Sequence, residues 1–192
     1  VVYVKAKAAE AGGANILPVG AVTKGLKGEE LAELGKMSAA GAVAFSDDGM
    51  PITNSELMRR ALEYSKMLGR PILAHCEDAS LTKGFVMNEG PVSARLGLRG
   101  YLDAAEAAMA ARDCYLAALT GGHVHICQVS ARETVDVVRA AKAKGIHVTA
   151  EAAPHHLLLT DERLADYESK YKMNPPLRTE ADVDAVLKGL AD

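Results

Sequence analysis

Side chains that can bind a metal ion or move a proton follow two apolar segments of this sequence. Asp47 and Asp48 come directly after residues 42–46, and His75 comes directly after residues 71–74. Carboxylates bind divalent cations or accept protons, and neutral imidazole is a common ligand of such cations. Taken alone, a solvated Asp-Gly turn and a hydrogen-bonded core histidine are the ordinary interpretations. The two segments together favour a metal site, because such a site needs ligands that converge from several strands.

A third apolar segment leads to Cys127 and Gln128. His123, His125 and Cys127 are spaced two residues apart, so they share one face of a strand, and Gln128 is predicted to point to the opposite face. A glutamine amide is a poor zinc ligand compared with imidazole or carboxylate. An ordinary hydrogen-bonding role for Gln128 is the alternative.

Two later segments are also polar. His155 and His156 follow Pro154, and in an extended segment their side chains are predicted to point in opposite directions, so only one could orient a neighbouring group by hydrogen bonding. A solvent-facing pair near a turn is the alternative. Asn174 precedes two prolines that restrict the backbone, so its amide is held in place and could both donate to and accept from an amide substrate. The alternative for Asn174 is a loop cap.

The elements that must position these residues alternate between strands and helices. The predicted strands are residues 15–20, 42–46, 71–74, 124–129 and 146–152. The predicted helices are residues 2–11, 28–40, 55–68, 104–119, 131–144 and 181–190. Continuous apolar strands separated by helices indicate an α/β fold with a parallel sheet covered on both faces.

Both an open doubly wound sheet and a closed barrel fit this alternation. The sequence has no GxGxxG after a strand and no GxxxxGK[ST], which disfavours nucleotide-binding doubly wound folds. In a β/α barrel the chemistry lies at the carboxyl ends of the strands, which is where this sequence becomes polar. About five β/α units are visible, and an eight-unit barrel needs about 250 residues. We therefore expect residues 1–192 to be part of a single barrel domain, a partial (β/α)8 TIM-type barrel without its N-terminal and C-terminal portions. The connection 77–103 is expected to be a functional lid or disordered.

Composition narrows the function classes. The chain has 192 residues, 49% of them hydrophobic, and a net charge of −3, which disfavours a nucleic-acid partner. No apolar run is long enough to span a bilayer, and no signal peptide is visible. The three cysteines have no CxxC spacing, so reduced thiols in a cytoplasmic protein are expected.

Several segments, in order along nearly the whole chain, resemble the class I dihydroorotases, which are β/α barrels of the amidohydrolase superfamily. These segments are residues 41–49, 74–77, 88–91, 96–98, 105–106, 112–113, 125–130, 154–161 and 172–178. The related hydantoinases and allantoinases usually bridge their metals with a carboxylated lysine. The aspartate in this chain therefore favours a dihydroorotase that bridges with Asp.

The resemblance implies roles for individual residues. Asp48 is similar to the metal-bridging carboxylate, with its neighbour Asp47 as the alternative, and His75 is similar to a metal ligand. Gln128 stands where the family has another metal-binding histidine. Asn174 is similar to the residue that holds the pyrimidine-type ring. The family's His-x-His pair and its catalytic aspartate are not in the chain, so no catalytic residue is assigned, and zinc (one or two ions in the intact family site) is expected to bind weakly or not at all.

The implied activity is the reversible closure of N-carbamoyl-aspartate to dihydroorotate in pyrimidine biosynthesis, with zinc activating a water molecule. Two alternatives stay open. One is a non-catalytic scaffold that associates with aspartate transcarbamoylase, and the other is a different cyclic-amide hydrolase of hydantoinase or allantoinase type. The chain alone is expected to be inactive. It is also expected to form homo-oligomers, to aggregate or to be completed by another chain, because an unclosed barrel exposes its edge strands.

Overall fold

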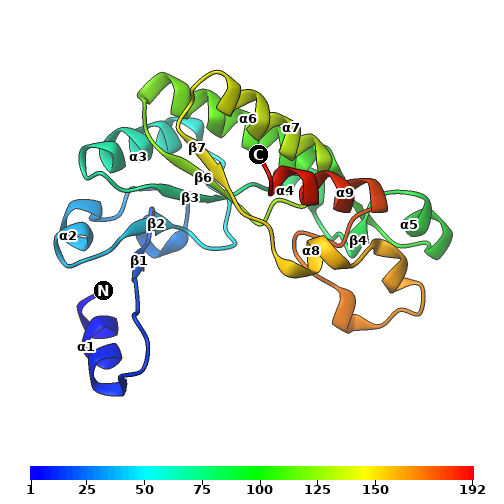
Figure 1. Ribbon diagram of the computed structural model, residues 1–192, viewed down its shortest axis with the longest axis horizontal. Helices are drawn as coiled ribbons and strands as arrows, with labels where there is room; N and C mark the ends of the chain where they lie inside the picture. The colour runs from blue at the N-terminus through cyan, green and yellow to red at the C-terminus, as the bar shows by residue number, and fades with distance from the viewer.

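A computed structural model describes all residues from 1 to 192. Its main element is a five-stranded parallel sheet with the order β1-β2-β3-β6-β7 (Figure 1). The strands are β1 (Val19–Gly20), β2 (Ala44–Ser46), β3 (Ile72–His75), β6 (Val124–Cys127) and β7 (Val148–Ala150). The predicted parallel α/β arrangement is confirmed, and the sheet is open rather than closed into a barrel.

Three long helices cover one face of this sheet (Figure 1). They are α3 (Ser55–Met67), α6 (Asp103–Thr120) and α7 (Arg132–Ala143). Helix α3 begins where the side chain of Asn54 accepts hydrogen bonds from the backbone of Glu56 and Leu57, as an N-cap residue does. The core lies between helices and sheet, where Leu62 of α3 packs in one cluster with Ile72 and Ile126 of the strands. Burial of these apolar side chains is the main force that holds the helices on the sheet.

The opposite face of the sheet is more polar and less buried, and we call it the lumen face. Along β6, Val124 and Ile126 are fully buried under the helices, whereas His125 and Cys127 are only partly buried. This alternation is the period of two expected of a strand. The lumen face is the side that a closed β/α barrel would enclose.

The connection 77–103 is built of short elements. It contains α4 (Ala79–Thr82), β4 (Met87–Asn88), α5 (Pro91–Leu96) and β5 (Gly100–Tyr101), with β4 and β5 paired in parallel. A second small core of Met87, Val92, Leu164 and Leu177 lies beneath them. Of the two alternatives for this connection, the disordered segment was therefore wrong, because the connection has a core of its own, and the functional lid stays a prediction.

Two other predicted elements were also wrong. The predicted helix 28–40 is shortened to α2 (Leu34–Ala39), since Leu31 instead forms an isolated bridge with Thr23. Residues after Pro154 are not extended but form α8 (Pro154–Leu158), with proline in the first turn, where its missing N–H costs nothing.

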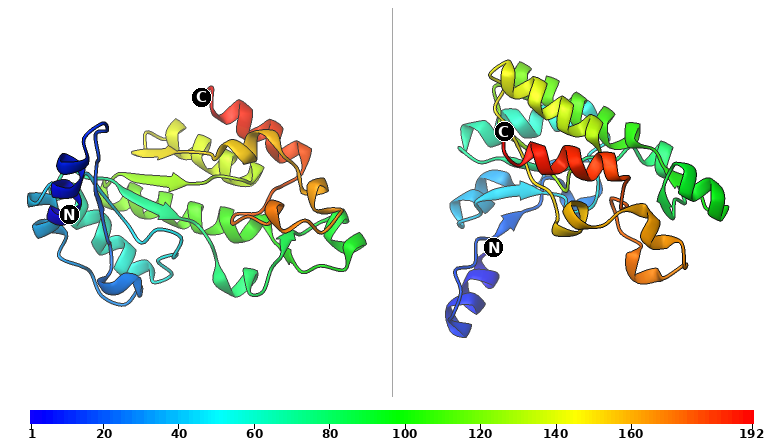
Figure 2. Two further views of the ribbon diagram at one scale, coloured as in Figure 1. Left: turned by 90° about the horizontal axis from the view of Figure 1, so that it is seen from below. Right: turned by 45° about the vertical axis from the view of Figure 1, so that its right-hand side comes forward.

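The remaining helices lie toward the ends of the chain. They are α1 (Val2–Ala11), α9 (Glu180–Gly189) and the short 3-10 helices η1 (Lys24–Leu26), η2 (Asp161–Leu164) and η3 (Ser169–Tyr171). Helix α1 has no buried residue and projects away from the sheet (Figures 1 and 2), whereas α9 packs beside α7 and α8. None of the helices combines the length and apolar character that crossing a membrane requires.

Candidate metal and substrate site

The two adjacent aspartates after β2 have different environments. Asp47 is buried, and its carboxylate accepts hydrogen bonds from the backbone N–H groups of Val22 and Thr23, at 2.8 and 2.9 Å, and from the Thr23 hydroxyl. Asp48 is exposed, and its backbone N–H donates to the Ser46 hydroxyl at 3.0 Å. Asp47 therefore joins the ends of β1 and β2, and Asp48 keeps its carboxylate free for a ligand.

Asp48 lines a cleft of about 430 Å³ at the lumen face. Its wall is formed by Val19, Gly20, Ala21, Leu26, Ser46, Asp48, Leu73, Cys127, Gln128 and Glu151. Four residues other than glycine have a positive φ, and three of them, Leu26 (57°), Asp48 (58°) and Gln128 (55°), lie in this wall. Left-handed conformations of such residues cost about 1–3 kcal/mol and gather at functional sites. Their concentration marks the cleft as the candidate site.

The predicted direction of Gln128 was wrong. The period of two placed it opposite Cys127, yet both residues line the cleft. The reason is that β6 ends at Cys127 and the left-handed backbone of Gln128 turns its side chain back toward the lumen face.

That turn brings Gln128 to His75. The buried His75 ring has Nδ1 at 3.0 Å from Oε1 of Gln128 and Nε2 at 3.0 Å from Oε2 of Glu77. Burial alone would lower the pKa of His75, but the hydrogen bonds with Glu77 and Gln128 raise it above its usual value. The hydrogen bond from His75 in turn lowers the pKa of Glu77 to about 2. Glu77 thus fixes the ring by one nitrogen and leaves the other directed at Gln128.

The same carboxylate holds Asn174. Nδ2 of Asn174 donates to Oε2 of Glu77 at 3.1 Å, and the Thr82 hydroxyl donates to the other oxygen at 2.5 Å. The peptide bond between Asn174 and Pro175 is cis. Glu77 therefore joins the end of β3 to a segment about a hundred residues later in the sequence. The side-chain amide oxygen of Asn174, Oδ1, forms no hydrogen bond within the chain.

His155 and His156 contact each other, and His156 contacts the segment that carries Asn174. Their rings are 4.3 Å apart, and Nε2 of the buried His156 lies 3.1 Å from the carbonyl oxygen of Pro175. Burial lowers the pKa of both residues. His156 thus supports the segment that carries Asn174.

The structure does not bring the predicted ligands together at one point, because His75 does not line the cleft that Asp48 and Gln128 line. Nδ1 of His75 and the carboxylate of Asp48 are ligand types that zinc prefers, whereas the Gln128 amide is weak. Three ligand atoms converge within 4.8 Å elsewhere, in the set His125, Cys127 and Glu151 and in the set Asp103, Glu133 and Asp182. Asp48 and His75 belong to neither set.

Two residues at this face had no predicted role. Glu77 lies two residues after His75, and Glu151 is the first residue after β7. The rule that identified Asp48 and His75, a polar side chain just past a strand, also points to Glu151. Glu77 gives no comparable signal, because its role depends on Asn174, which is distant in the sequence.

Comparison with known proteins decides the family. Residues 1–134 match the family described as "Dihydro-orotase-like". The chain belongs to this family. The dihydroorotase of Pelotomaculum thermopropionicum is 57% identical over 181 residues, which is 94% of this chain and 42% of that protein. The dihydroorotase of Syntrophotalea carbinolica is 53% identical over 99% of this chain and 45% of its own length. This dihydroorotase-like chain thus spans less than half of these relatives.

Solved structures agree on the fold. A D-hydantoinase crystal structure superimposes with a TM-score of 0.69 at 21% identity, covering 82% of this chain and 37% of the other. The D-hydantoinase (dihydropyrimidinase) from Thermus sp. has a TM-score of 0.67 at 25% identity, covering 90% and 39%. The open sheet of the dihydroorotase-like chain therefore matches part of each of these larger proteins.

Proposed function

We propose that residues 1–192 are part of the single barrel domain of a dihydroorotase, which interconverts N-carbamoyl-aspartate and dihydroorotate in pyrimidine biosynthesis. The support is the 50–57% identity to proteins named dihydroorotase along nearly the whole chain. The likeness to hydantoinases, at 20–25% identity, supports the same architecture.

The geometric observation that carries this proposal is the double contact of Glu77. One carboxylate oxygen of Glu77 accepts from both the His75 ring and the Asn174 amide, at 3.0 and 3.1 Å. A proposed metal ligand and a proposed substrate-binding amide are thereby fixed relative to each other. Such fixed positions are what a reaction at a cyclic amide requires, because misplacement of reacting groups slows the chemistry strongly.

We assign the residues as follows. When zinc is bound, Asp48 would supply the bridging carboxylate, since the carboxylate of Asp47 is occupied by the end of β1. His75 would ligate through Nδ1, while Glu77 holds Nε2. Gln128 lies at the position of a further metal ligand, and Asn174 holds the amide of the substrate ring. Zinc, when bound, supplies an activated water and polarises the amide carbonyl.

Gln128 favours a second candidate, a non-catalytic relative that acts as a scaffold for aspartate transcarbamoylase. Its amide accepts from the His75 ring at 3.0 Å, so the buried imidazole is satisfied with no ion. In an enzyme, the same position is better served by a histidine, which is a stronger ligand.

A chimera distinguishes the two candidates. The matching segment of the Pelotomaculum thermopropionicum dihydroorotase is replaced by this chain, with Gln128 kept or changed by Gln128→His, and dihydroorotate formation and hydrolysis are measured with hydantoin as the comparison substrate. Activity of both chimeras supports the enzyme, and activity of the Gln128→His chimera alone supports the scaffold. A folded Gln128→His chimera that turns over hydantoin but no dihydroorotate would overturn the proposed function.

For the separate 192-residue chain we propose no turnover, a cytoplasmic location of the parent protein, and self-association through the exposed edges of β1 and β7. Dihydroorotate turnover by the zinc-loaded chain would contradict the first of these proposals. A monomer in sedimentation would contradict the last.

A further inference from the structure

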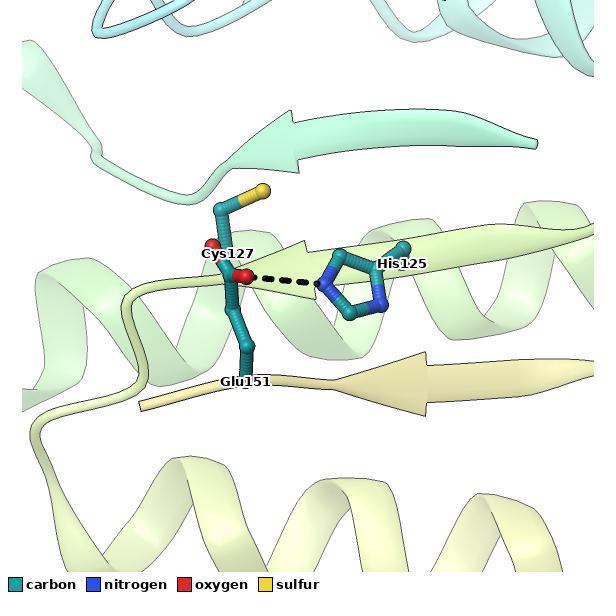
Figure 3. A group of neighbouring side chains, drawn as sticks. All are labelled: His125, Cys127 and Glu151. Atoms are coloured by element: carbon teal, nitrogen blue, oxygen red, sulfur yellow. Dashed lines mark ion pairs between the residues drawn. The ribbon is translucent and has the colours of Figure 1, made fainter. Parts of the chain in front are cut away.

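Three side chains that have no role in the proposed function direct ligand atoms at one another on the lumen face. His125 and Cys127 lie on β6, and Glu151 reaches toward them from just past β7 (Figure 3). The imidazole nitrogen, the thiol sulfur and a carboxylate oxygen all lie within 4.8 Å of one another. Their pairing follows from the parallel register, in which His125 lies opposite Thr149 and Ile126 opposite Ala150.

The spacing of these atoms is close to that of a tetrahedral zinc site. Zinc–ligand bonds of about 2.0–2.3 Å place neighbouring ligand atoms about 3.3–3.6 Å apart. Nε2 of His125 and Oε2 of Glu151 are already 3.5 Å apart. The side chain of Glu151 is 54% exposed, so its carboxylate can rotate toward the Cys127 sulfur without moving the strand.

The His125 ring is held in the orientation that a ligand needs. Its Nδ1 lies 2.8 Å from the hydroxyl of Thr149 on the neighbouring strand. This contact leaves Nε2 as the nitrogen that faces Glu151. Metal-ligating histidines are commonly fixed in this way through their second ring nitrogen.

The cleft beside the cluster favours a cation. Cys127 and Glu151 form part of its wall, and the only charged side chains among the ten lining residues are the carboxylates of Asp48 and Glu151. No lysine or arginine lines this wall, so a positive ion that enters meets only negative charge.

We propose that His125, Cys127 and Glu151 form a zinc-binding site in the wall of the cleft, distinct from the site of Asp48 and His75. Thiolate, imidazole and carboxylate are the ligands that zinc takes in proteins, and three protein ligands leave a fourth position for water or a small anion. This site depends only on residues of this chain and not on the proposed dihydroorotase activity.

Cobalt(II) tests the site, because a cobalt–thiolate bond gives a charge-transfer absorption that carboxylate and imidazole do not. The purified chain is titrated with Co2+ and then with Zn2+. We expect the thiolate band to appear with Co2+ and to disappear as Zn2+ displaces it. Cys127→Ser should abolish the band, and Glu151→Gln should weaken binding at least about tenfold. Thr149→Val, which frees the His125 ring, should weaken it about 10–100-fold.

Two controls separate this site from its surroundings. Cys114→Ala removes a cysteine that lies on α6, away from the cleft, and should leave the band unchanged. The double variant Asp48→Asn, His75→Ala should also keep it. The proposal would be overturned if the thiolate band did not appear in the original chain, or if it survived in Cys127→Ser. Loss of the band in the double variant would also overturn it, because that loss would indicate one site shared with Asp48 and His75. If circular dichroism shows that Cys127→Ser does not fold, the metal affinity of Glu151→Gln tests the site instead, because residue 151 is exposed. An unchanged affinity of that variant would refute the site.

Discussion

Replacement of Arg178 by methionine should remove the centre of a buried polar network. The Arg178 side chain is 1% exposed. Nε donates to the Ser130 hydroxyl at 3.0 Å, and Nη1 donates to Oδ1 of Asn88 and to the Tyr101 carbonyl at 2.9 and 3.0 Å. Nη1 also forms an ion pair with Asp103 at 2.5 Å. The residue therefore fixes β4 and β5 against α6 and anchors the segment that begins at Asn174.

The size of the effect follows from the charges that are left behind. Nη2 of Arg178 lies 3.6 Å from Glu106, whose side chain is 2% exposed, so Arg178→Met leaves a fully buried carboxylate and the half-buried Asp103 without their cation. Removal of one partner of a buried ion pair costs about 3–5 kcal/mol. Methionine fills part of the volume, and hydrophobic packing against the Tyr101 ring, now 4.8 Å from the guanidinium, offsets only a small part of that cost. We therefore expect the free energy of unfolding to fall by about 3–5 kcal/mol.

Urea unfolding of the two variants Arg178→Met and Arg95→Met measures this difference. Arg95 is the matched control, because it forms one ion pair with Glu162 in which the side chains are 55% and 60% exposed. Such a pair contributes about 0–1 kcal/mol. The reasoning would be refuted if both variants lost less than about 1 kcal/mol with unchanged slopes of the urea dependence.

Two further predictions concern carboxylates. Burial raises the pKa of Asp113 from 3.8 to about 6, so the folded chain binds this proton more tightly than the unfolded chain, and stability should fall by up to about 3 kcal/mol as pH rises from about 4 to about 6. Asp113→Asn should remove that part of the pH dependence of urea unfolding, and an unchanged pH profile would contradict it. Asp47→Ala should destabilise the chain by at least about 2 kcal/mol, because it leaves buried donors of Val22 and Thr23 without an acceptor. Asp48→Asn, which keeps a side chain that tolerates the left-handed backbone of residue 48, should change stability by about 0.5 kcal/mol or less. Equal losses in the two urea curves would show that the aspartates are not distinguished by burial.

Much of the fold was predictable because its signals are local. The apolar strands are continuous, and α3 and α7 combine an apolar stripe with polar faces over more than three turns. The positions of Asp48 and His75 at the carboxyl ends of β2 and β3 were predictable for a related reason, and their role as metal ligands stays a prediction.

The errors occurred where the backbone leaves a regular period. A left-handed residue ends the alternation at Gln128, and Pro154 begins a helix whose five residues give too short a pattern to recognise. Strands β4 and β5 have two residues each, so they carry no periodic signal at all. The role of Glu77 depends on Asn174 and could not be predicted from local spacing.

Gln128 has a physical consequence that sequence identity alone does not indicate. A buried imidazole needs a partner for each nitrogen, and in most metal sites the ion is one of those partners. Here Glu77 and Gln128 satisfy both nitrogens of His75. A histidine at position 128 could accept a hydrogen bond from Nδ1 of His75 only through one of its tautomers. Binding of a cation shared with His75 would stabilise such a histidine more than that hydrogen bond would. The single substitution Gln128→His therefore tests whether the cleft can still form a metal site. If it can, the zinc affinity of the Gln128→His variant should rise, and if the cleft serves only the fold, the affinity should not change. The rest of the structure should stay unchanged in both cases.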